Sequence, residues 1–310
     1  MIRKMNENDI KEVQLIDKVC FKRSYTRRTE ILKAFLIDNA SLVYEDKGKV
    51  VGYIFNHILG DFAWFGTLGV DPNYRGSNIG KELVNKTIDM FRNEFNIKTI
   101  GIVTMPESCY NIGFYIKRGF TPRELALRLK RNLNSKTEIS NINEKFKIEF
   151  IDGENEEQYE KIISNAKKIS SSLYEGLDMS SEIDIAYKSK TGTSFIIYEN
   201  NKVIGFAILR FKSVFDEEDN SVHIRLICIK NTVSPYIEIL DAVLNEIYKY
   251  SYDGGFSNVF IDVNTLNANI CSHLLKNHYF QVDKSSVTLL IGNENFYSEI
   301  NGLMLFRTVT

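Results

Sequence analysis

The spacing of apolar residues alternates between the period of a helix and that of a strand, and each change predicts where an element ends. Near the start, Ile10, Val13 and Ile16 recur at helical spacing after Asn8 or Asp9, either of which can cap a helix. The predicted elements of the first third are, in chain order, strand 2–5, helix 9–21, helix 28–37, strands 41–44, 49–59 and 61–70, a helix from 78, strand 97–105, helix 108–119 and strand 123–130.

The same succession begins again after a polar, patternless stretch at 134–144, which we predict to be a linker. The elements predicted beyond it are strand 146–151, helices 156–169 and 180–187, a hairpin, strand 222–229, helix 235–250, strand 259–263 and helix 268–277. The segment at 43–54 also matches that at 197–207, apart from one residue in the turn. We therefore predict a tandem duplication of an α+β domain, with copies at 1–133 and 145–310.

One stretch carries the clearest chemistry, residues 68–81 with the sequence LGVDPNYRGSNIGK. Pro72 ends a strand there, and a helix begins at about Asn78. The first turn of a helix has backbone N–H groups without partners and a partial positive charge, which suits a phosphate. Arg75 and Lys81 add charge at this end. A turn that only reverses the chain is the alternative reading.

Composition narrows the functional classes. A chain of 310 residues predicts two domains, each large enough for its own core. With 39 Lys and Arg against 40 Asp and Glu, the net charge of -1 argues against a nucleic-acid-binding protein. Neither a long apolar span nor an apolar signal region is visible, so we expect no membrane association and a cytoplasmic location.

Cysteine and histidine spacing gives no metal-binding motif. The four cysteines, Cys20, Cys109, Cys228 and Cys271, are far apart in the chain and are expected to be reduced thiols. The four histidines, His57, His223, His273 and His278, have no acidic or thiol partner at ligand spacing. We therefore expect no metal.

Two motifs resemble the GCN5-related N-acetyltransferase superfamily. The first is RGSNIG at 75–80, similar to the family's Arg/Gln-x-x-Gly-x-Gly/Ala, with Asn78 in place of a glycine. Asparagine tolerates a left-handed backbone, so the loop is expected to be kept. The second is NIGFYIKRGF at 111–120, similar to the family's Phe-Tyr-x-Lys-x-Gly-Phe. Ser108 stands where many members carry an asparagine that contacts the cofactor.

The resemblance covers about residues 1–133 and implies an α+β fold, acetyl-CoA as co-substrate and an amine as acceptor. The residues it implies for binding acetyl-CoA are Leu68, Gly69, Val70, Arg75, Gly76, Ser77, Asn78, Ile79, Gly80, Lys81, Ser108 and Asn111. The backbone N–H of Leu68 would stabilise charge on the thioester oxygen. Tyr115 would donate a proton to the departing thiolate. An aromatic that only packs on its helix face is the alternative for Tyr115.

The group that deprotonates the amine stays open. Asp61, Glu107 and Glu30 are candidates, each of which can instead be a surface charge, and a water relay competes with all three. The aromatic residues Phe62, Trp64 and Phe65 could line an acceptor pocket, but core packing is the favoured reading. By strand alternation, Phe65 faces away from the other two.

The second copy lacks these motifs. At 230–236 it has neither the arginine nor the paired glycines, and Pro235 removes a donor. A leucine stands where Tyr115 would align. We expect a second domain without a cofactor site, and because the phosphate turn is missing we do not expect it to transfer another acyl group. A non-catalytic acyl-CoA sensor or interaction protein is the alternative function, and the sequence leaves a homodimer open.

Overall fold

The computed structural model describes residues 1–133, 145–211, 220–232, 234–292, 296–297 and 301–307. The predicted linker at 134–144 therefore lies outside the described residues. The first part contains β1 (Ile2–Lys4), η1 (Glu7–Asp9), α1 (Ile10–Cys20), α2 (Thr29–Ala34), β2 (Leu42–Asp46), β3 (Lys49–Leu59), β4 (Phe62–Val70), η2 (Pro72–Tyr74), α3 (Ile79–Asn93), β5 (Thr99–Thr104), α4 (Cys109–Ile116) and β6 (Thr121–Asn132).

The second part repeats this order and adds one strand. It contains β7 (Phe146–Phe150), α5 (Glu156–Leu173), α6 (Ser180–Lys188), β8 (Gly192–Glu199), β9 (Lys202–Phe211), β10 (Ser221–Lys230), α7 (Tyr236–Asp253), β11 (Asn258–Asn264), α8 (Ala268–Asn277), β12 (Gln281–Ile291) and β13 (Gly302–Phe306). The mixed α+β fold class is confirmed. No described helix is long and apolar enough to cross a membrane.

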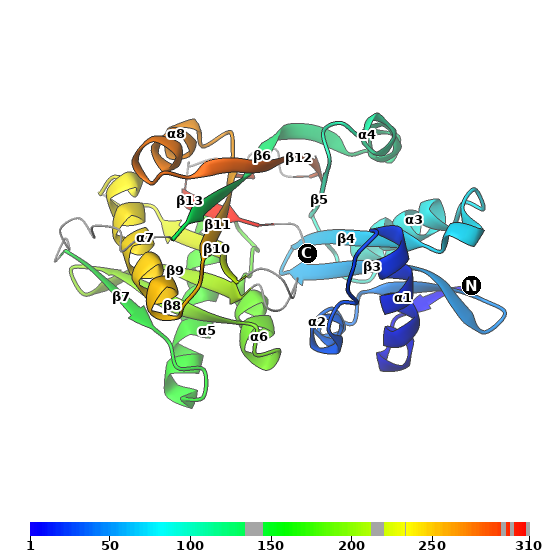
Figure 1. Ribbon diagram of the computed structural model, residues 1–310, viewed down its shortest axis with the longest axis horizontal. Coiled ribbons are helices and arrows are strands. Elements are labelled where there is room, and N and C mark those ends of the chain that lie inside the picture. The colour runs from blue at the N-terminus through cyan, green and yellow to red at the C-terminus, as the bar shows by residue number, and fades with distance from the viewer. Residues whose placement is uncertain (134–144, 212–219, 233, 293–295, 298–300, 308–310) are drawn as a thin grey trace.

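All described strands belong to one mostly antiparallel sheet of 13 strands. Its order is β1-β2-β3-β4-β5-β12-β6-β11-β10-β9-β8-β7, with β13 attached to β10. Read inward from either end, the strands follow in matching succession until the two halves meet at β12 and β6. Figure 1 shows these two strands at the top of the molecule, between the halves.

The halves exchange their last strands, which corrects one expectation. The strand predicted at 123–130 forms as β6, but it does not close the first half. It pairs with β11 of the second half, in the register Leu129↔Ile261, and with β12. In return, β12 pairs with β5 of the first half. The sequence predicted neither β12 nor β13.

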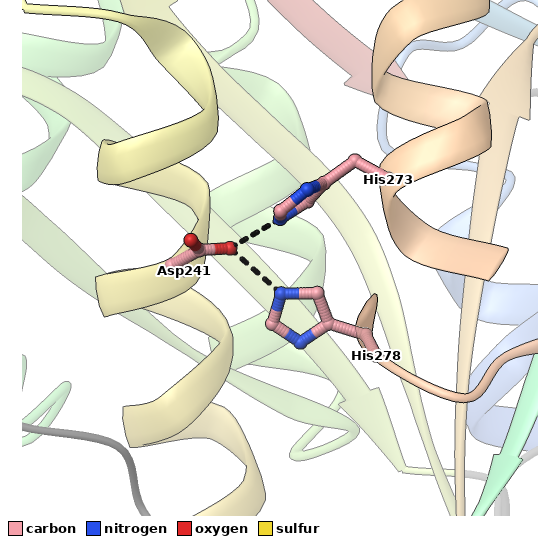
Figure 2. A group of neighbouring side chains, drawn as sticks. All are labelled: Asp241, His273 and His278. Atoms are coloured by element: carbon pink, nitrogen blue, oxygen red, sulfur yellow. Dashed lines mark hydrogen bonds and ion pairs between the residues drawn. The ribbon is translucent and has the colours of Figure 1, made fainter. Parts of the chain in front are cut away.

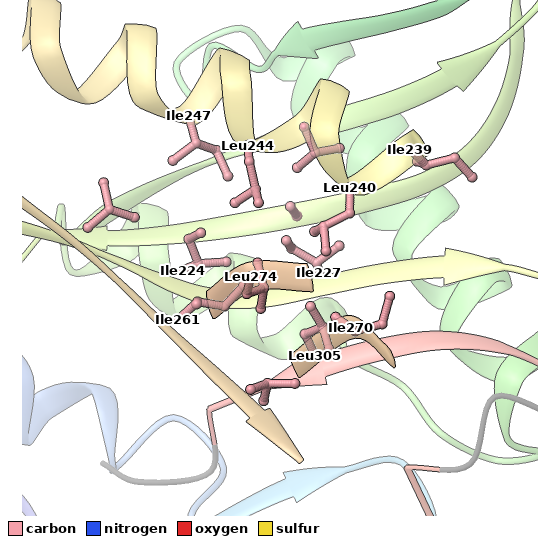
Figure 3. Close-up of a cluster of buried hydrophobic side chains, with 14 of the residues drawn as sticks. Ile224, Ile227, Ile239, Leu240, Leu244, Ile247, Ile261, Ile270, Leu274 and Leu305 are labelled. Atoms are coloured by element: carbon pink, nitrogen blue, oxygen red, sulfur yellow. The ribbon is translucent and has the colours of Figure 1, made fainter. Parts of the chain in front are cut away.

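Helices cover both faces of each half. In the first half, α1 and α2 pack on Tyr53 and Phe55, whereas α3 and α4 pack around Ile54 and Phe65. In the second half α7 and α8 share one face, where Asp241 of α7 lies beside His273 and His278 (Figure 2). The large apolar core under these helices includes Ile227, Leu244 and Leu274, with Leu305 from β13 (Figure 3).

Local caps differ slightly from expectation. Asp9 stands at the N-cap of α1, as one of the two alternatives predicted, but its side chain makes no capping hydrogen bond to that helix. It belongs instead to a capping box around η1: the Asn6 side chain accepts from the N–H of Asn8 at 2.9 Å, and Asp9 accepts from the N–H of Asn6 in return. The second helix ends at Ala34, three residues earlier than predicted. Such end effects leave the position of the site unchanged.

Candidate active site

The sheet opens between β4 and β5. These parallel strands pair only from Phe62↔Thr99 to Trp64↔Gly101. Beyond Trp64, the described pairings of β4 are to β3 alone, where Leu68 lies opposite Ile54. At Leu68 and Gly69, one edge of β4 is therefore left for another extended segment to approach.

A bulge marks this opening. The register of β3 and β4 shifts between Ile54 and Asn56, so that Gly66 and Thr67 are accommodated opposite a single residue. Gly69 is required for a different reason, because a Cβ there would lie 2.5 Å from the ring of Tyr53. The bulge and the close packing of Tyr53 together fix the position of Leu68.

The predicted phosphate loop has the expected backbone. Asn78 adopts the left-handed conformation, with φ of 63°, directly before α3, and Gly76 also has a positive φ of 86°. Arg75, Ser77 and Lys81 are exposed. Ser77 donates both its backbone N–H and its hydroxyl to Tyr74, so a tight turn leads into the helix. Asparagine thus serves where a glycine was expected by the family pattern.

Helix α3 packs directly on the open end of β4. Ile79 is buried, and a Cβ added to Gly80 would lie 3.7 Å from Leu68 and 3.8 Å from Val70. The positive end of α3 and the open edge of β4 therefore meet at one place.

A groove continues from this place between α3 and α4. Its volume is about 570 Å³, and it is lined by Asn78, Lys81, Asn85, Cys109, Tyr110, Gly113, Phe114, Lys117 and Arg118. Three of these side chains are cationic and none is acidic. Arg118 spans the groove, donating from Nε to Asn85 Oδ1 at 3.1 Å. The groove suits a ligand with several negative charges and a flat ring system.

Tyr115 lies in the same apolar cluster as Leu68, Val70 and Phe65. Its side chain is 7% exposed and its ring contacts those of Phe65 and Phe120. Burial raises the pKa of the Tyr115 hydroxyl to about 12, an effect that Arg118 partly opposes. The phenol is therefore protonated at neutral pH. Both readings of Tyr115, as a proton donor and as a packed aromatic, agree with this position.

The two polar residues predicted near the cofactor arm already have local partners. The hydroxyl of Ser108 caps α4 by accepting from the N–H of Asn111 at 3.4 Å. The Asn111 side chain donates to Thr104 Oγ1 at 3.2 Å, which ties α4 to the end of β5. These bonds hold α4 beside the opening.

The three carboxylates considered as bases are not equivalent. Asp61 precedes β4 and lies seven residues from Leu68, on the order of 20 Å along a strand, in an ion pair with Lys98. It does not meet the opening. Glu107 is exposed in the loop before α4, and Glu30 is exposed on α2. Glu107, Glu30 and a water relay therefore remain as candidates for the base that deprotonates the amine.

The aromatic residues of β4 belong to the core. Phe62 and Trp64 are each 4% exposed and pack with Phe296 of the second half. Phe65 packs on the opposite face, with Tyr115. The favoured core reading is confirmed, and with it the alternation of the faces.

Sequence reasoning missed a buried polar network beside the bulge. Asp17 of α1 is fully buried and accepts from Tyr53 Oη at 2.6 Å and from Arg27 Nε at 3.1 Å. Arg27 also donates to Thr67 Oγ1 at 3.0 Å, inside the bulge. One signal was available: Asp17 follows Val13 by four residues, so it lies on the apolar stripe of its helix. A charge there needs a buried partner.

The corresponding opening in the second half is filled. β10 pairs with β11 only from Ser221 to Ile224, and β13 then pairs with β10 from Leu226 to Lys230. In the second half, β13 thus covers the edge of β10 that corresponds to the open edge of β4. At the start of α7, Ser234 donates to the carboxylate of Glu199, which also forms an ion pair with Lys145, so the polar groups at this helix start already have partners within the chain.

Comparisons with known proteins identify a family and a fold. The acetyltransferase (GNAT) family model matches residues 10–120. A protein of Methanocaldococcus jannaschii, described as an uncharacterized N-acetyltransferase, is 31% identical over 134 residues, which are 40% of this chain and 80% of that protein.

Solved structures share the fold over the whole chain. A Pyrococcus horikoshii protein, provisionally described as an acetyltransferase, has a TM-score of 0.68 at 14% identity and is matched over 100% of this chain and 95% of its own. A GCN5-related N-acetyltransferase from Sphaerobacter thermophilus has a TM-score of 0.63 at 12% identity, and the match covers 100% of this chain and 98% of that protein. At these identities the likeness concerns the fold.

Proposed function

Because the chain belongs to the acetyltransferase (GNAT) family, we propose that its first half binds acetyl-CoA and transfers the acetyl group to an acceptor amine. The observation that carries the proposal is the open edge of β4, which lies between the positive end of α3 and the buried phenol of Tyr115. An extended thiol arm fits such an edge in the way that a peptide strand adds to a sheet.

Each part of the site has a role in this proposal. The loop at 75–81 binds the pyrophosphate through backbone N–H groups, with Arg75 and Lys81 adding charge. The basic groove between α3 and α4 receives the remaining phosphate and the base. The backbone N–H of Leu68 donates to the thioester oxygen as negative charge develops there.

The chemical step is direct attack in a ternary complex. The free amine nitrogen forms a bond to the thioester carbon, and the bond from that carbon to sulfur breaks. The departing thiolate takes a proton from Tyr115, which is protonated at neutral pH. The proton that the amine loses passes to water, or to Glu107 in the loop before α4 or Glu30 on α2, which are both exposed.

In the same proposal the second half is a duplicated, non-catalytic copy. β13 covers the edge of β10, and Glu199 lies against the start of α7. Leu275 of α8 lies five residues before the buried Phe280, and Tyr115 lies five residues before the buried Phe120. A leucine therefore stands in the second half where the first half has its proposed proton donor. The role left to this half is to support the first half with β12 and with the core around Phe62 and Trp64.

Calorimetric titration of the full chain with acetyl-CoA tests the proposal. One site per chain is expected. No binding would overturn the proposal, and two sites would overturn the assignment of the second half. Release of free thiol with a panel of amines then separates an enzyme from a non-catalytic sensor: binding without turnover by any amine would favour the sensor.

A further inference from the structure

Three side chains able to bind a metal converge between α7 and α8, away from the proposed active site. Asp241 comes from α7, His273 from α8, and His278 directly follows α8. Asp241 Oδ1 lies 2.6 Å from His273 Nε2 and 2.7 Å from His278 Nε2, and all three atoms lie within 4.8 Å of one another. Figure 2 shows both imidazole rings pointing at the same carboxylate oxygen.

This arrangement is typical of a ligand set rather than of a simple ion pair. Two imidazoles and one carboxylate are the protein ligands of several zinc sites that keep an open position. Without a metal, both Nε2 atoms must donate a hydrogen to one oxygen. A cation among the three would instead receive one lone pair from each, at distances of about 2.0–2.2 Å after a small outward shift of the side chains.

The burial of the two histidines and the further contacts of His278 also favour a metal site. The side chains of His273 and His278 are 15% and 10% exposed, whereas that of Asp241 is 40% exposed, so any further coordination position faces water. The other ring nitrogen of His278 lies 3.2 Å from Tyr248 Oη. Arg131 of β6 in turn packs over the Tyr248 ring at 4.0 Å. Such outer contacts orient metal-binding histidines.

The cluster occupies the place that corresponds to the basic groove of the first half. Arg118 lies two residues before the buried Phe120 and bonds Asn85 of α3; His278 lies two residues before the buried Phe280 and bonds Asp241 of α7. The two helix pairs are thus bridged at matching positions, by an arginine and an amide in one half and by potential metal ligands in the other.

We propose that Asp241, His273 and His278 bind one divalent transition-metal ion, with zinc as the first candidate, which fastens α8 to α7. The sequence alone predicted no metal, because these histidines have no acidic or thiol partner at metal-ligand spacing in the chain. Asp241 is 32 residues from His273, and only the packing of α7 against α8 brings them together. The site is independent of the proposed acetyl transfer.

The test uses the full chain, stripped of metal with a chelator and then titrated with zinc chloride by calorimetry. One equivalent of zinc should bind. Cobalt chloride should give visible absorption bands of a cobalt ion with nitrogen and oxygen ligands. His273→Ala and Asp241→Asn should each weaken zinc binding at least tenfold, since the loss of an outer-shell partner alone costs that much.

Two controls keep the result decisive. Glu238→Gln removes an exposed carboxylate from the same helix, one turn before Asp241, and should leave zinc binding unchanged. Asp241→Asn retains an oxygen that can accept from both imidazoles, so circular dichroism should show a folded protein. Zinc binding that is absent in the wild type, or equally tight in the Asp241 and His273 variants, would overturn the proposal and leave a hydrogen-bonded cluster only.

Discussion

At the scale of single residues, burial decides the chemistry of several ionisable groups. Asp38 is one of them: its side chain is 11% exposed and accepts from the N–H of Ile58 at 3.0 Å. Burial raises the pKa of the Asp38 carboxyl to about 6. The folded state therefore binds a proton more tightly than the unfolded state, whose Asp pKa is about 3.9.

This shift predicts that Asp38→Asn stabilises the protein at high pH. Above pH 6 the native carboxylate is charged and buried, which costs up to about 3 kcal/mol because its pKa is about 6 in the folded state and about 3.9 in the unfolded state. The amide carries no charge and still accepts from Ile58. As the pH falls from about 6 to about 4, the native Asp38 takes up its proton and the advantage of the variant should shrink.

Urea unfolding of both proteins at pH 7.5 and pH 4.5 measures this difference. Asp89→Asn, on the exposed face of α3, is the matched control and should change the free energy of unfolding little at either pH. An Asp38→Asn variant that is less stable than the wild type at pH 7.5, or equally stabilised at both, would contradict the argument.

Tyr115→Phe tests the proton donor. The variant keeps the ring contacts with Phe65 and Phe120 but loses the hydroxyl, so acetyl-CoA binding should persist while kcat falls by about 10²–10⁴-fold. Tyr252→Phe is the control, because Tyr252 is 46% exposed on α7 and does not line the groove. Steady-state rates that stay within about twofold of the wild type would make Tyr115 a packing residue only.

At the scale of elements, the turn between β4 and α3 concentrates the positive charge of the proposed cofactor site. Arg75→Ala and Lys81→Ala should each weaken acetyl-CoA binding by about tenfold or more, as expected for a hydrogen bond to a charged group. Lys86→Ala is the control, since Lys86 is exposed on the same helix but does not line the groove. Calorimetry at two salt concentrations checks the result, because screening should weaken wild-type binding more than that of Arg75→Ala. Equal affinities for all variants would remove the loop from the site.

These elements could be predicted because their signals are local. The left-handed Asn78, the helix after it and the strand before it follow from turn chemistry and apolar period within about a dozen residues. The network of Asp17, Arg27 and Tyr53 could not be placed in the same way, because its members come from α1, the segment before α2 and β3. Only one of them, Asp17, left a sign in the sequence.

Strand partners were the least predictable feature of the fold. The apolar pattern of β6 identifies a strand but not its neighbours, since pairing across more than 100 residues depends on the whole packed structure. The same applies to β13, which covers β10, and to the cluster of Asp241 with two histidines. Contacts between residues far apart in the chain leave no periodic pattern in the local sequence.

At the scale of the whole molecule, the strand exchange joins the two halves into one structure. β6 belongs by sequence to the first half, yet its fully buried Leu129 lies in the core under α7 and α8. Conversely, Trp64 of the first half packs against Phe296 and Phe306 of the second. Each half therefore needs the other to bury some of its apolar side chains, so we expect the halves to unfold together.

Leu129→Ala tests this coupling. Removing a fully buried leucine should lower the free energy of unfolding by about 2–5 kcal/mol. Trp64 is the only tryptophan, so its fluorescence reports on β4, whereas far-ultraviolet circular dichroism reports on all helices. Both signals should show one transition at the same urea concentration, and Leu129→Ala should shift both equally. Leu125→Ala, on the same strand but 40% exposed, should shift them far less. If Leu129→Ala instead moved the dichroism and left the Trp64 transition in place, the halves would be independent domains in spite of the exchanged strands.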